Sequence, residues 1–128
     1  MKLLFDAHAF IWWDENPDKL GAHARAACFD IANELLLSAA SVWEMQLKVM
    51  LSKLHLQKPL PQLISEQLQK NAIRILPVNI EHVLHLDSLP SHHKDPFDRL
   101  LIAQAQVEGC ELITHDHVIS RYPVKILW

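Results

Sequence analysis

Four acidic residues carry the chemistry that this sequence suggests: Asp6 in LLFDAHAF, Glu44 in SAASVWEM, Asp98 in HKDPFDRLLIAQA and Asp116 in LITHDH. Each follows a short apolar run or lies in the first turn of an expected helix. Carboxylates gathered at one point repel one another unless a cation lies among them, and clusters of oxygen ligands favour Mg²⁺ or Mn²⁺. Such a site suits hydrolysis of a phosphodiester. The elements that carry the four residues must therefore bring them together.

The pattern along the chain alternates short apolar strands with longer amphipathic helices. The expected strands are residues 2–5, 35–38, 73–78, 110–114 and 124–128, and the expected helices are 7–14, 21–33, 41–51, 60–71, 79–87 and 95–109. Apolar strands between helices predict an α/β fold with a mainly parallel sheet of about five strands, covered on both faces. Ligands bind at the carboxyl ends of such strands, where Asp6 and Asp116 fall. Topology alone does not place the start of helix 95–109 at that edge.

Length and composition predict one domain, residues 1–128, because the chain is short and half of it is hydrophobic. We find no secretory signal and no run long enough to span a membrane. Cys28 and Cys110 stand in apolar company and are expected to be buried thiols, which favours a cytoplasmic protein. The formal charge of −3 counts against a nucleic-acid partner, although clustered carboxylates would account for part of it.

Each acidic residue also has a structural interpretation. Asp6 suits the N-cap of helix 7–14. Glu44 closes a Ser41-Val-Trp-Glu44 sequence, which fits a capping box. Asp116 suits a turn or a short-helix cap, and the Thr114 hydroxyl could hydrogen-bond a carboxylate or a water there. A cap leaves the second carboxylate oxygen free, so these roles do not exclude a metal site.

Asp95 and Asp98 flank Pro96-Phe97 at the start of helix 95–109. Proline favours the first helical position, which makes Asp95 the expected N-cap and places Asp98 in the first turn. Asp98 is therefore the residue left free to bind an ion, although its charge also suits the helix dipole. Arg99 could pair with Asp95 or contact a phosphate, and the sequence does not rank these.

Histidines and tryptophans crowd the same neighbourhoods. The histidines, expected at the surface or beside a phosphate, lack zinc-site spacing; they are His8, His92, His93, His115 and His117. The tryptophans could stack on bases, but helical spacing favours the core or a subunit interface; they are Trp12, Trp13 and Trp43. Two glycines are too few for the glycine-rich nucleotide-binding loops.

The sequence resembles the PIN-domain family, and within it the VapC-type toxin ribonucleases of bacterial type II toxin–antitoxin pairs. The matching segments are LLFDAHAFIWW, SAASVWEMQLK, HKDPFDRLLIAQA and LITHD, followed by Tyr122 and the terminal VKILW. The match covers essentially the whole chain in order, and DPFDRLLIAQA is its most specific part.

The resemblance implies a three-layer α/β/α sandwich and Mg²⁺- or Mn²⁺-dependent cleavage of RNA, often transfer or ribosomal RNA. It also implies a homodimer and an antitoxin whose basic side chain enters the acidic pocket. By position, Asp6, Glu44, Asp98 and Asp116 match the family's acidic quartet: Asp6, Asp98 and Asp116 as ligands, and Glu44 as a ligand or the group that orients water. Ala7 departs from the pattern, because many relatives have Thr or Ser there.

Two other functions remain open from the sequence. One is a PIN-like module that binds RNA or a protein without cutting, which Ala7 favours and the four acids oppose. The other is a small-molecule phosphohydrolase with Asp6 as the nucleophile. Such enzymes commonly have a second aspartate two residues later, and here that position is His8.

Overall fold

A five-stranded, entirely parallel sheet forms the centre of the computed structural model, which describes residues 1–128. The strand order is β3-β2-β1-β4-β5. The strands are β1 Lys2–Phe5, β2 Glu34–Ser38, β3 Arg74–Leu76, β4 Glu111–Ile113 and β5 Ile126–Leu127. All five expected strands are present, and all their carboxyl ends lie at one edge because every pairing is parallel.

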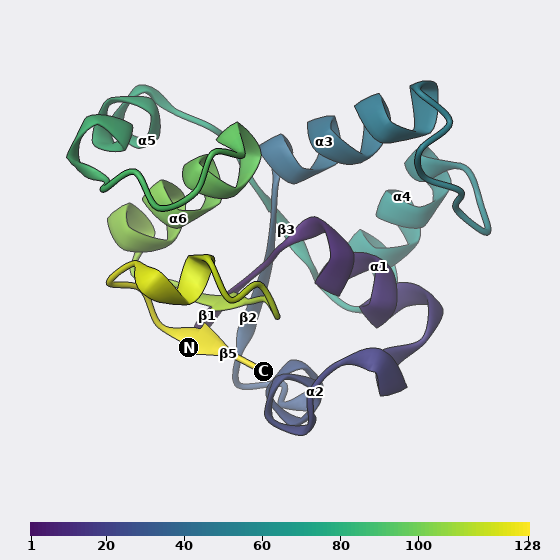
Figure 1. The fold of residues 1–128 in the computed structure, drawn as a ribbon. Helices are drawn as coiled ribbons and strands as arrows, with labels where there is room; N and C mark the ends of the chain where they lie inside the picture. The colour runs from purple at the N-terminus through teal and green to yellow at the C-terminus, as the bar shows by residue number, and fades with distance from the viewer.

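Helices cover both faces of this sheet and complete the expected three-layer sandwich (Figure 1). They are α1 Ala7–Glu15, α2 Ala22–Phe29, α3 Ala39–Met50, α4 Leu60–Lys70, α5 Ile80–His85 and α6 Pro96–Glu108. Short 3₁₀ turns occur at Pro17–Lys19, Leu86–Ser88 and Ile119–Arg121. None of the helices is both long and apolar enough to cross a bilayer.

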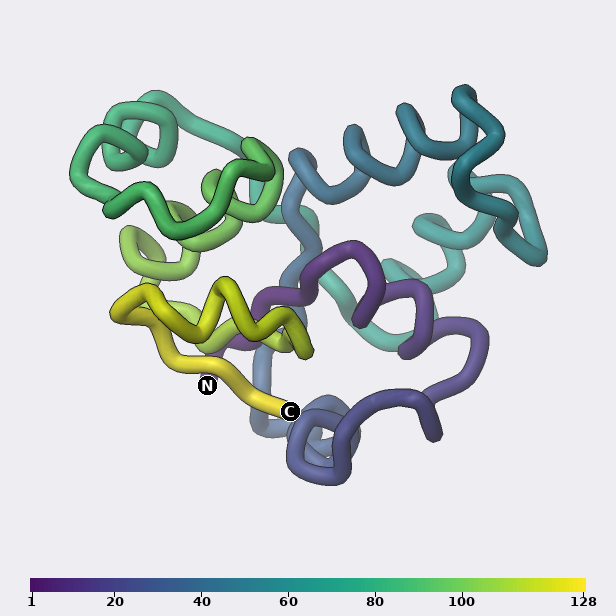
Figure 2. Tube along the Cα trace, viewed as in Figure 1, coloured from purple at the N-terminus to yellow at the C-terminus, as the bar shows by residue number.

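The two faces of the sheet bury separate sets of side chains because alternate strand residues point to opposite sides. Leu3 and Phe5 pack against α1 to α4, whereas Leu4 between them packs against α6. Figure 2 shows the same division along the chain, with α5 and α6 on the other side of the strands from α1, α3 and α4. Cys28 lies in the first core and Cys110 in the second, both as free thiols, as expected.

The helix expected over residues 21–33 is shorter than predicted, because α2 ends at Phe29. Asp30 accepts a hydrogen bond from the Ala32 N–H at 2.9 Å, and the Asn33 side chain donates to the Ala27 carbonyl at 2.9 Å. Such local side-chain bonds compete with helical ones, so the polar residues here form a turn despite the preceding alanines.

Trp128, after β5, packs closely on the start of α2. Its carbonyl accepts a hydrogen bond from the Ala24 N–H at 2.8 Å. A Cβ at Gly21 would lie only 2.2 Å from the same carbonyl oxygen, so this position accepts no side chain. The Trp128 ring lies 5.8 Å from the ring of Trp12 on α1, which ties the end of the sheet to the first helix.

Candidate active site

Asp6 and Asp116 follow β1 and β4, which are neighbours in the sheet. The chain leaves β1 toward β2 on one side, while β4 and β5 lie on the other. Such a switch point opens a crevice at the carboxyl edge of a parallel sheet. The Asp6 N–H donates to the Ile113 carbonyl of β4 at 3.1 Å, so a hydrogen bond joins the two strand ends directly beside the acidic residues.

Asp6 caps α1, as the sequence predicted. One carboxylate oxygen, Oδ1, accepts a hydrogen bond from the Ala9 N–H at 2.7 Å. Burial raises the pKa of Asp6, and hydrogen bonds from the Thr114 hydroxyl and the Ala9 N–H only partly oppose this. The Asp6 carboxylate is therefore held in place by a backbone N–H of α1, while its negative charge is poorly compensated.

Asp116 is held by the turn that follows β4. Its Oδ1 accepts a hydrogen bond from the Val118 N–H at 2.8 Å, and its own N–H donates to the Thr114 hydroxyl oxygen at 3.1 Å. Burial opposes ionisation here, but hydrogen bonds from His93 and Val118 outweigh it and lower the pKa of Asp116. Asp116 thus remains charged more readily than Asp6.

Glu44 lies on the second turn of α3, and the capping box predicted for it is wrong. The helix begins at Ala39, and Ser38 is the N-cap, with its hydroxyl accepting from the Ala40 N–H at 3.0 Å. Ser41 is therefore inside the helix, and Glu44 is free of a capping role. Its side chain is nearly buried, with the residue 6% exposed, and pairs with Lys48 Nζ at 2.8 Å.

Asp95 and Asp98 divide their roles at the start of α6 as the sequence predicted. Asp95 Oδ1 accepts from the Phe97 N–H at 2.8 Å and the Asp98 N–H at 3.1 Å, which makes it the N-cap. Asp98 follows in the first turn. Burial, together with the nearby charges of Asp95 and Glu44, raises the pKa of Asp98 to about 7.

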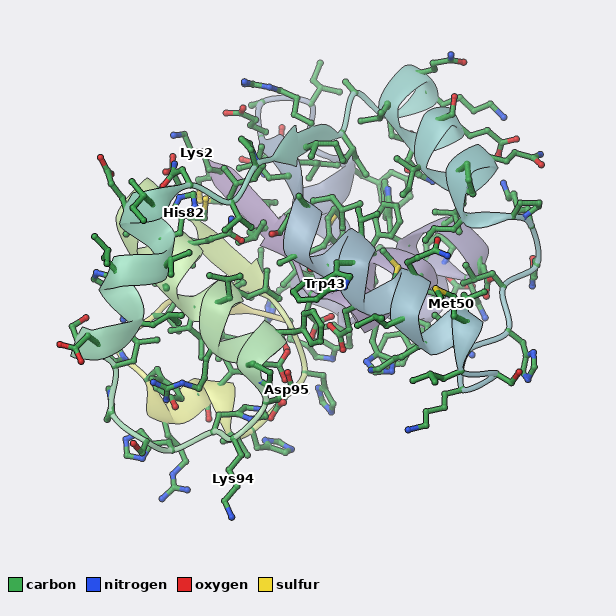
Figure 3. All side chains as sticks on the ribbon, turned by 90° about the horizontal axis from the view of Figure 1, so that it is seen from above. Lys2, Trp43, Met50, His82, Lys94 and Asp95 are labelled. Atoms are coloured by element: carbon green, nitrogen blue, oxygen red, sulfur yellow. The ribbon has the colours of Figure 1, made fainter.

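A buried hydrogen bond places α6 against the start of α3. The Ser38 hydroxyl donates to the side-chain amide oxygen of Gln104, Oε1, at 2.6 Å, and both side chains are fully buried. Nearer the site, the rings of Trp43 on α3 and Phe97 on α6 lie 5.0 Å apart. Figure 3 shows Trp43 beside the end of α6 that begins at Asp95. This packing brings Asp98 to the strand edge, which topology alone does not require.

The four acids line one pocket of about 400 Å³ at this edge. Its walls comprise Asp6, Ala7, His8, Trp12, Glu44, Lys48, Asp95, Asp98, His115, Asp116 and Trp128. Ligand atoms of two lining residues, Asp98 and Asp116, and of His93, which is not a lining residue, all lie within 4.8 Å of one another. Asp6 and Glu44 share the pocket but do not belong to that tight group.

Comparison with known proteins identifies the family of this chain. The model of the PIN domain family matches residues 3–125. The chain belongs to the PIN-domain family. It is 30% identical over 115 residues to ribonuclease VapC22 of Mycobacterium tuberculosis, a match that covers 89% of this chain and 86% of that protein.

Two solved structures share the PIN fold at low sequence identity. One is VapBC2 from Rickettsia felis bound to a DNA fragment from their promoter, with a TM-score of 0.73, 15% identity, and coverage of 98% of this chain and 97% of that one. The other is VapBC-1 from nontypeable Haemophilus influenzae, with a TM-score of 0.65, 19% identity, and coverage of 98% and 96%. These likenesses support the fold.

Three residues at or beside the pocket of this PIN domain were not predicted from the sequence to contact the acids. Lys48 could have been found, because it stands four residues after Glu44 on one helix face. Trp128 reaches the pocket wall only through the pairing of β5 with β4. His93 was grouped with histidines expected at the surface or beside a phosphate, and its Nε2 lies 3.0 Å from carboxylate oxygens of both Asp98 and Asp116.

Arg99 does not pair with Asp95, which was one of the two interpretations that the sequence left open. Its guanidinium donates to the Pro90 carbonyl at 2.9 Å, the Tyr122 hydroxyl at 3.3 Å and the Leu86 carbonyl at 3.3 Å. Through these hydrogen bonds Arg99 holds the segment that precedes α6 against the helix, which is a structural role. The basic residue on the pocket wall is Lys48.

The aromatic residues and the other histidines divide between core and pocket. Trp13 is buried and Trp12 packs partly on the same core, as expected, but Trp43 is 59% exposed. His8 and His115 line the pocket. The remaining two pack on other rings, with His92 against Tyr122 and His117 against His115.

Proposed function

We propose that this PIN domain is a metal-dependent endoribonuclease and the toxin of a toxin–antitoxin pair. The observation that carries the proposal is that Asp6, Glu44, Asp98 and Asp116 line one pocket. They do so in a chain that resembles a VapC ribonuclease over nearly its whole length. Four carboxylates at the edge of a parallel sheet suit hydrolysis of a phosphodiester and no covalent nucleophile is needed.

The residues of the pocket fit a hard divalent cation. Five carboxylates line it, counting Asp95, and Lys48 is the one lysine or arginine on its wall. The raised pKa of Asp98, which burial and neighbouring carboxylates cause, indicates negative charge that the protein's own cations leave uncompensated. Oxygen donors with excess negative charge favour Mg²⁺ or Mn²⁺, and we assign Asp6, Asp98 and Asp116 as the residues that hold it.

When bound, such an ion neutralises charge on the phosphate and lowers the pKa of a water molecule. Glu44 is assigned to bind the ion or to orient the attacking water, and Lys48 fixes one of its oxygens. Lys48 also offers a positive charge to the phosphate. Trp12 and Trp128 form an apolar part of the pocket wall on which a nucleobase can stack.

The proposed protein partners are an antitoxin and a second copy of this chain. An antitoxin's basic side chain would enter the pocket and compensate its negative charge. Large apolar side chains are exposed on α3 and α5, among them Trp43, Met50, Ile80 and Leu84, and they offer surface for both contacts.

The test is cleavage of total transfer RNA and ribosomal RNA by the purified protein, with Mg²⁺, with Mn²⁺ and with EDTA. Asp6→Asn is the informative variant, because asparagine also caps a helix and the fold is retained. Asp87→Asn is the matched control, since Asp87 is exposed and outside the pocket. We expect metal-dependent cutting that Asp6→Asn loses and Asp87→Asn keeps.

Other outcomes point to the two remaining functions. RNA binding without cutting would indicate the non-catalytic module, in which Ala7 replaces a hydroxyl of the site. The Thr114 hydroxyl, which hydrogen-bonds at Asp6 and Asp116, supports catalysis without a hydroxyl at position 7. Hydrolysis of p-nitrophenyl phosphate with phosphate attached to Asp6 would indicate the phosphohydrolase.

A further inference from the structure

His93 touches two of the four acids although it belongs to the loop that precedes α6. Its Nε2 atom hydrogen-bonds Asp116 Oδ2 at 3.0 Å and lies 3.0 Å from Asp98 Oδ2. Asp116 follows β4, whereas Asp98 is carried by α6. A single ring nitrogen thus joins an acid of the sheet edge to an acid of a helix.

The hydrogen bond at the other ring nitrogen, Nδ1, indicates which nitrogen of His93 carries the proton. Nδ1 accepts a hydrogen bond from the Asp95 N–H at 3.1 Å, so it has no proton of its own. A neutral ring then bears its proton on Nε2 and donates it toward the carboxylates. The backbone is fixed as well, since the His93 N–H donates to the Tyr122 hydroxyl at 2.8 Å.

We propose that His93 is a positioning residue of the metal site, which donates its Nε2–H to hold Asp116 against Asp98. The inference rests on the proposed function for the identity of the bound ion, but its test does not require RNA cleavage. Partners that orient carboxylate ligands in this way strongly influence metal affinity, even though they do not touch the ion.

The competing role is direct ligation, because His93, Asp98 and Asp116 could together hold an ion. Ligation through Nε2 would require the proton to move to Nδ1. The Asp95 N–H would then lose its acceptor and face another N–H. The hydrogen bonds on both sides of the ring therefore favour the donor role over the ligand role.

Two substitutions separate the two sides of the ring. Glutamine at position 93 keeps a donor near the place of Nε2, whereas asparagine keeps only an acceptor near the place of Nδ1. His93→Gln and His93→Asn each lose one of the two bonds, which makes them a matched pair, and His93→Ala loses both. The measurement is Mn²⁺ affinity by titration calorimetry, with thermal melts to confirm folding.

We expect His93→Asn and His93→Ala to weaken Mn²⁺ binding by about 10-fold or more, and His93→Gln to stay within about threefold of the wild type. Pulsed electron paramagnetic resonance of the bound Mn²⁺ should show no nitrogen coupling from His93. Unchanged affinity in His93→Ala would overturn the proposal. A nitrogen coupling that His93→Gln abolishes would assign the ligand role instead.

A measurement on the wild type needs no variant. Long-range ¹H–¹⁵N spectra of the Mg²⁺-loaded protein should show a proton on Nε2 of His93 and none on Nδ1, and a proton on Nδ1 would overturn the inference. The nuclease proposal fails separately. Weakened Mn²⁺ binding in His93→Ala, together with a wild type that binds Mn²⁺ but cuts no RNA, would sustain the positioning role alone. A wild type that binds neither ion would overturn both.

Discussion

The two acids at strand ends and the two acids on helices reach the pocket by different means. Asp6 and Asp116 each accept a backbone hydrogen bond from a residue two or three positions later, so local structure holds them. Glu44 and Asp98 have no such bond, and their positions depend on how α3 and α6 pack. Placement by strand geometry is a local property, whereas placement by helix packing depends on contacts far apart in the sequence.

Asp116 and Asp98 also differ in how the protein affects their charge. Asp116 has its pKa lowered by hydrogen bonds from His93 and Val118, whereas Asp98 has its pKa raised to about 7 by burial and by neighbouring carboxylates. Burial also raises the pKa of Asp6, so the contrast in charge holds between Asp98 and Asp116 and not between helices and strand ends in general. The predictions below test whether Asp98 is more costly to the fold than Asp116 and whether its position depends on distant contacts.

The largest expected effect is on activity. Asp98→Asn should lower metal-dependent RNA cleavage by roughly 100-fold or more, because it removes a charge from the proposed ligand set. Asparagine retains the size of the side chain, so circular dichroism should be unchanged. Initial rates at saturating Mn²⁺ would measure the loss. Cleavage within threefold of the wild type would remove Asp98 from the site.

The next effect tests the long-range contact that places α6. Ser38→Ala and Gln104→Ala should each cost about 1–3 kcal/mol of unfolding free energy, since each leaves a buried polar partner unpaired. The double variant should cost less than their sum by about 1 kcal/mol or more, because the two share one bond. Urea unfolding would measure all three. Strict additivity would show that the bond does not couple the helix to β2.

The third effect is on stability, and at pH 8 substitution by asparagine should change it in opposite directions at Asp98 and at Asp116. The folded-state pKa of Asp98 is raised, so its contribution to stability is lost as pH rises from about 4 to about 7. Asp98→Asn should therefore stabilise the metal-free protein at pH 8 by about 2 kcal/mol and have little effect at pH 4. Thermal melts in EDTA at both values would measure it.

Asp116→Asn is the control for that experiment, with the opposite sign. Because the pKa of Asp116 is lowered, its charge stabilises the fold above pH 4, and the benefit is lost as pH falls further. The variant should thus be no more stable than the wild type at pH 8. Stabilisation by both substitutions would mean that the helix and the strand end do not differ in this respect.

The smallest effect separates the helix cap at Asp95 from the proposed metal site at Asp98. Asp95→Ala should cost about 1 kcal/mol, because the Phe97 and Asp98 N–H groups lose their acceptor. Asp95→Asn should cost only a few tenths, since asparagine caps equally well. Chemical denaturation would compare them. Equal losses in the two variants would assign the stability to the charge of Asp95 and not to its cap.

The sheet and the strand-end acids could be predicted from the sequence because their determinants are local. Short apolar runs between helices indicate a parallel sheet, and residues directly after such strands fall at its carboxyl edge. The caps at Asp6 and Asp95 were predicted correctly for the same reason. Asp98 was distinguished from Asp95 by Pro96, which sets where the helix begins.

The errors concern residues whose role depends on tertiary contacts. Ser38 caps α3 although Ser41 fits the capping pattern better, because β2 runs directly into the helix. The Arg99 guanidinium donates to the backbone carbonyls of Pro90 and Leu86, which precede it in sequence by 9 and 13 residues but lie beside it in the fold. His93 has no distinguishing spacing, since its two carboxylate neighbours are 5 and 23 residues away.

The contact between Gly21 and Trp128 makes the pocket sensitive to a position that has no chemistry of its own. Any side chain at Gly21 would displace the Trp128 backbone, and the ring of Trp128 forms part of the pocket wall. A variant such as Gly21→Ala would thus alter the proposed nucleobase-stacking surface without changing one acidic residue. If the protein is the toxin we propose, a random mutagenesis screen for loss of toxicity should accordingly recover Gly21 variants alongside those of the four carboxylates.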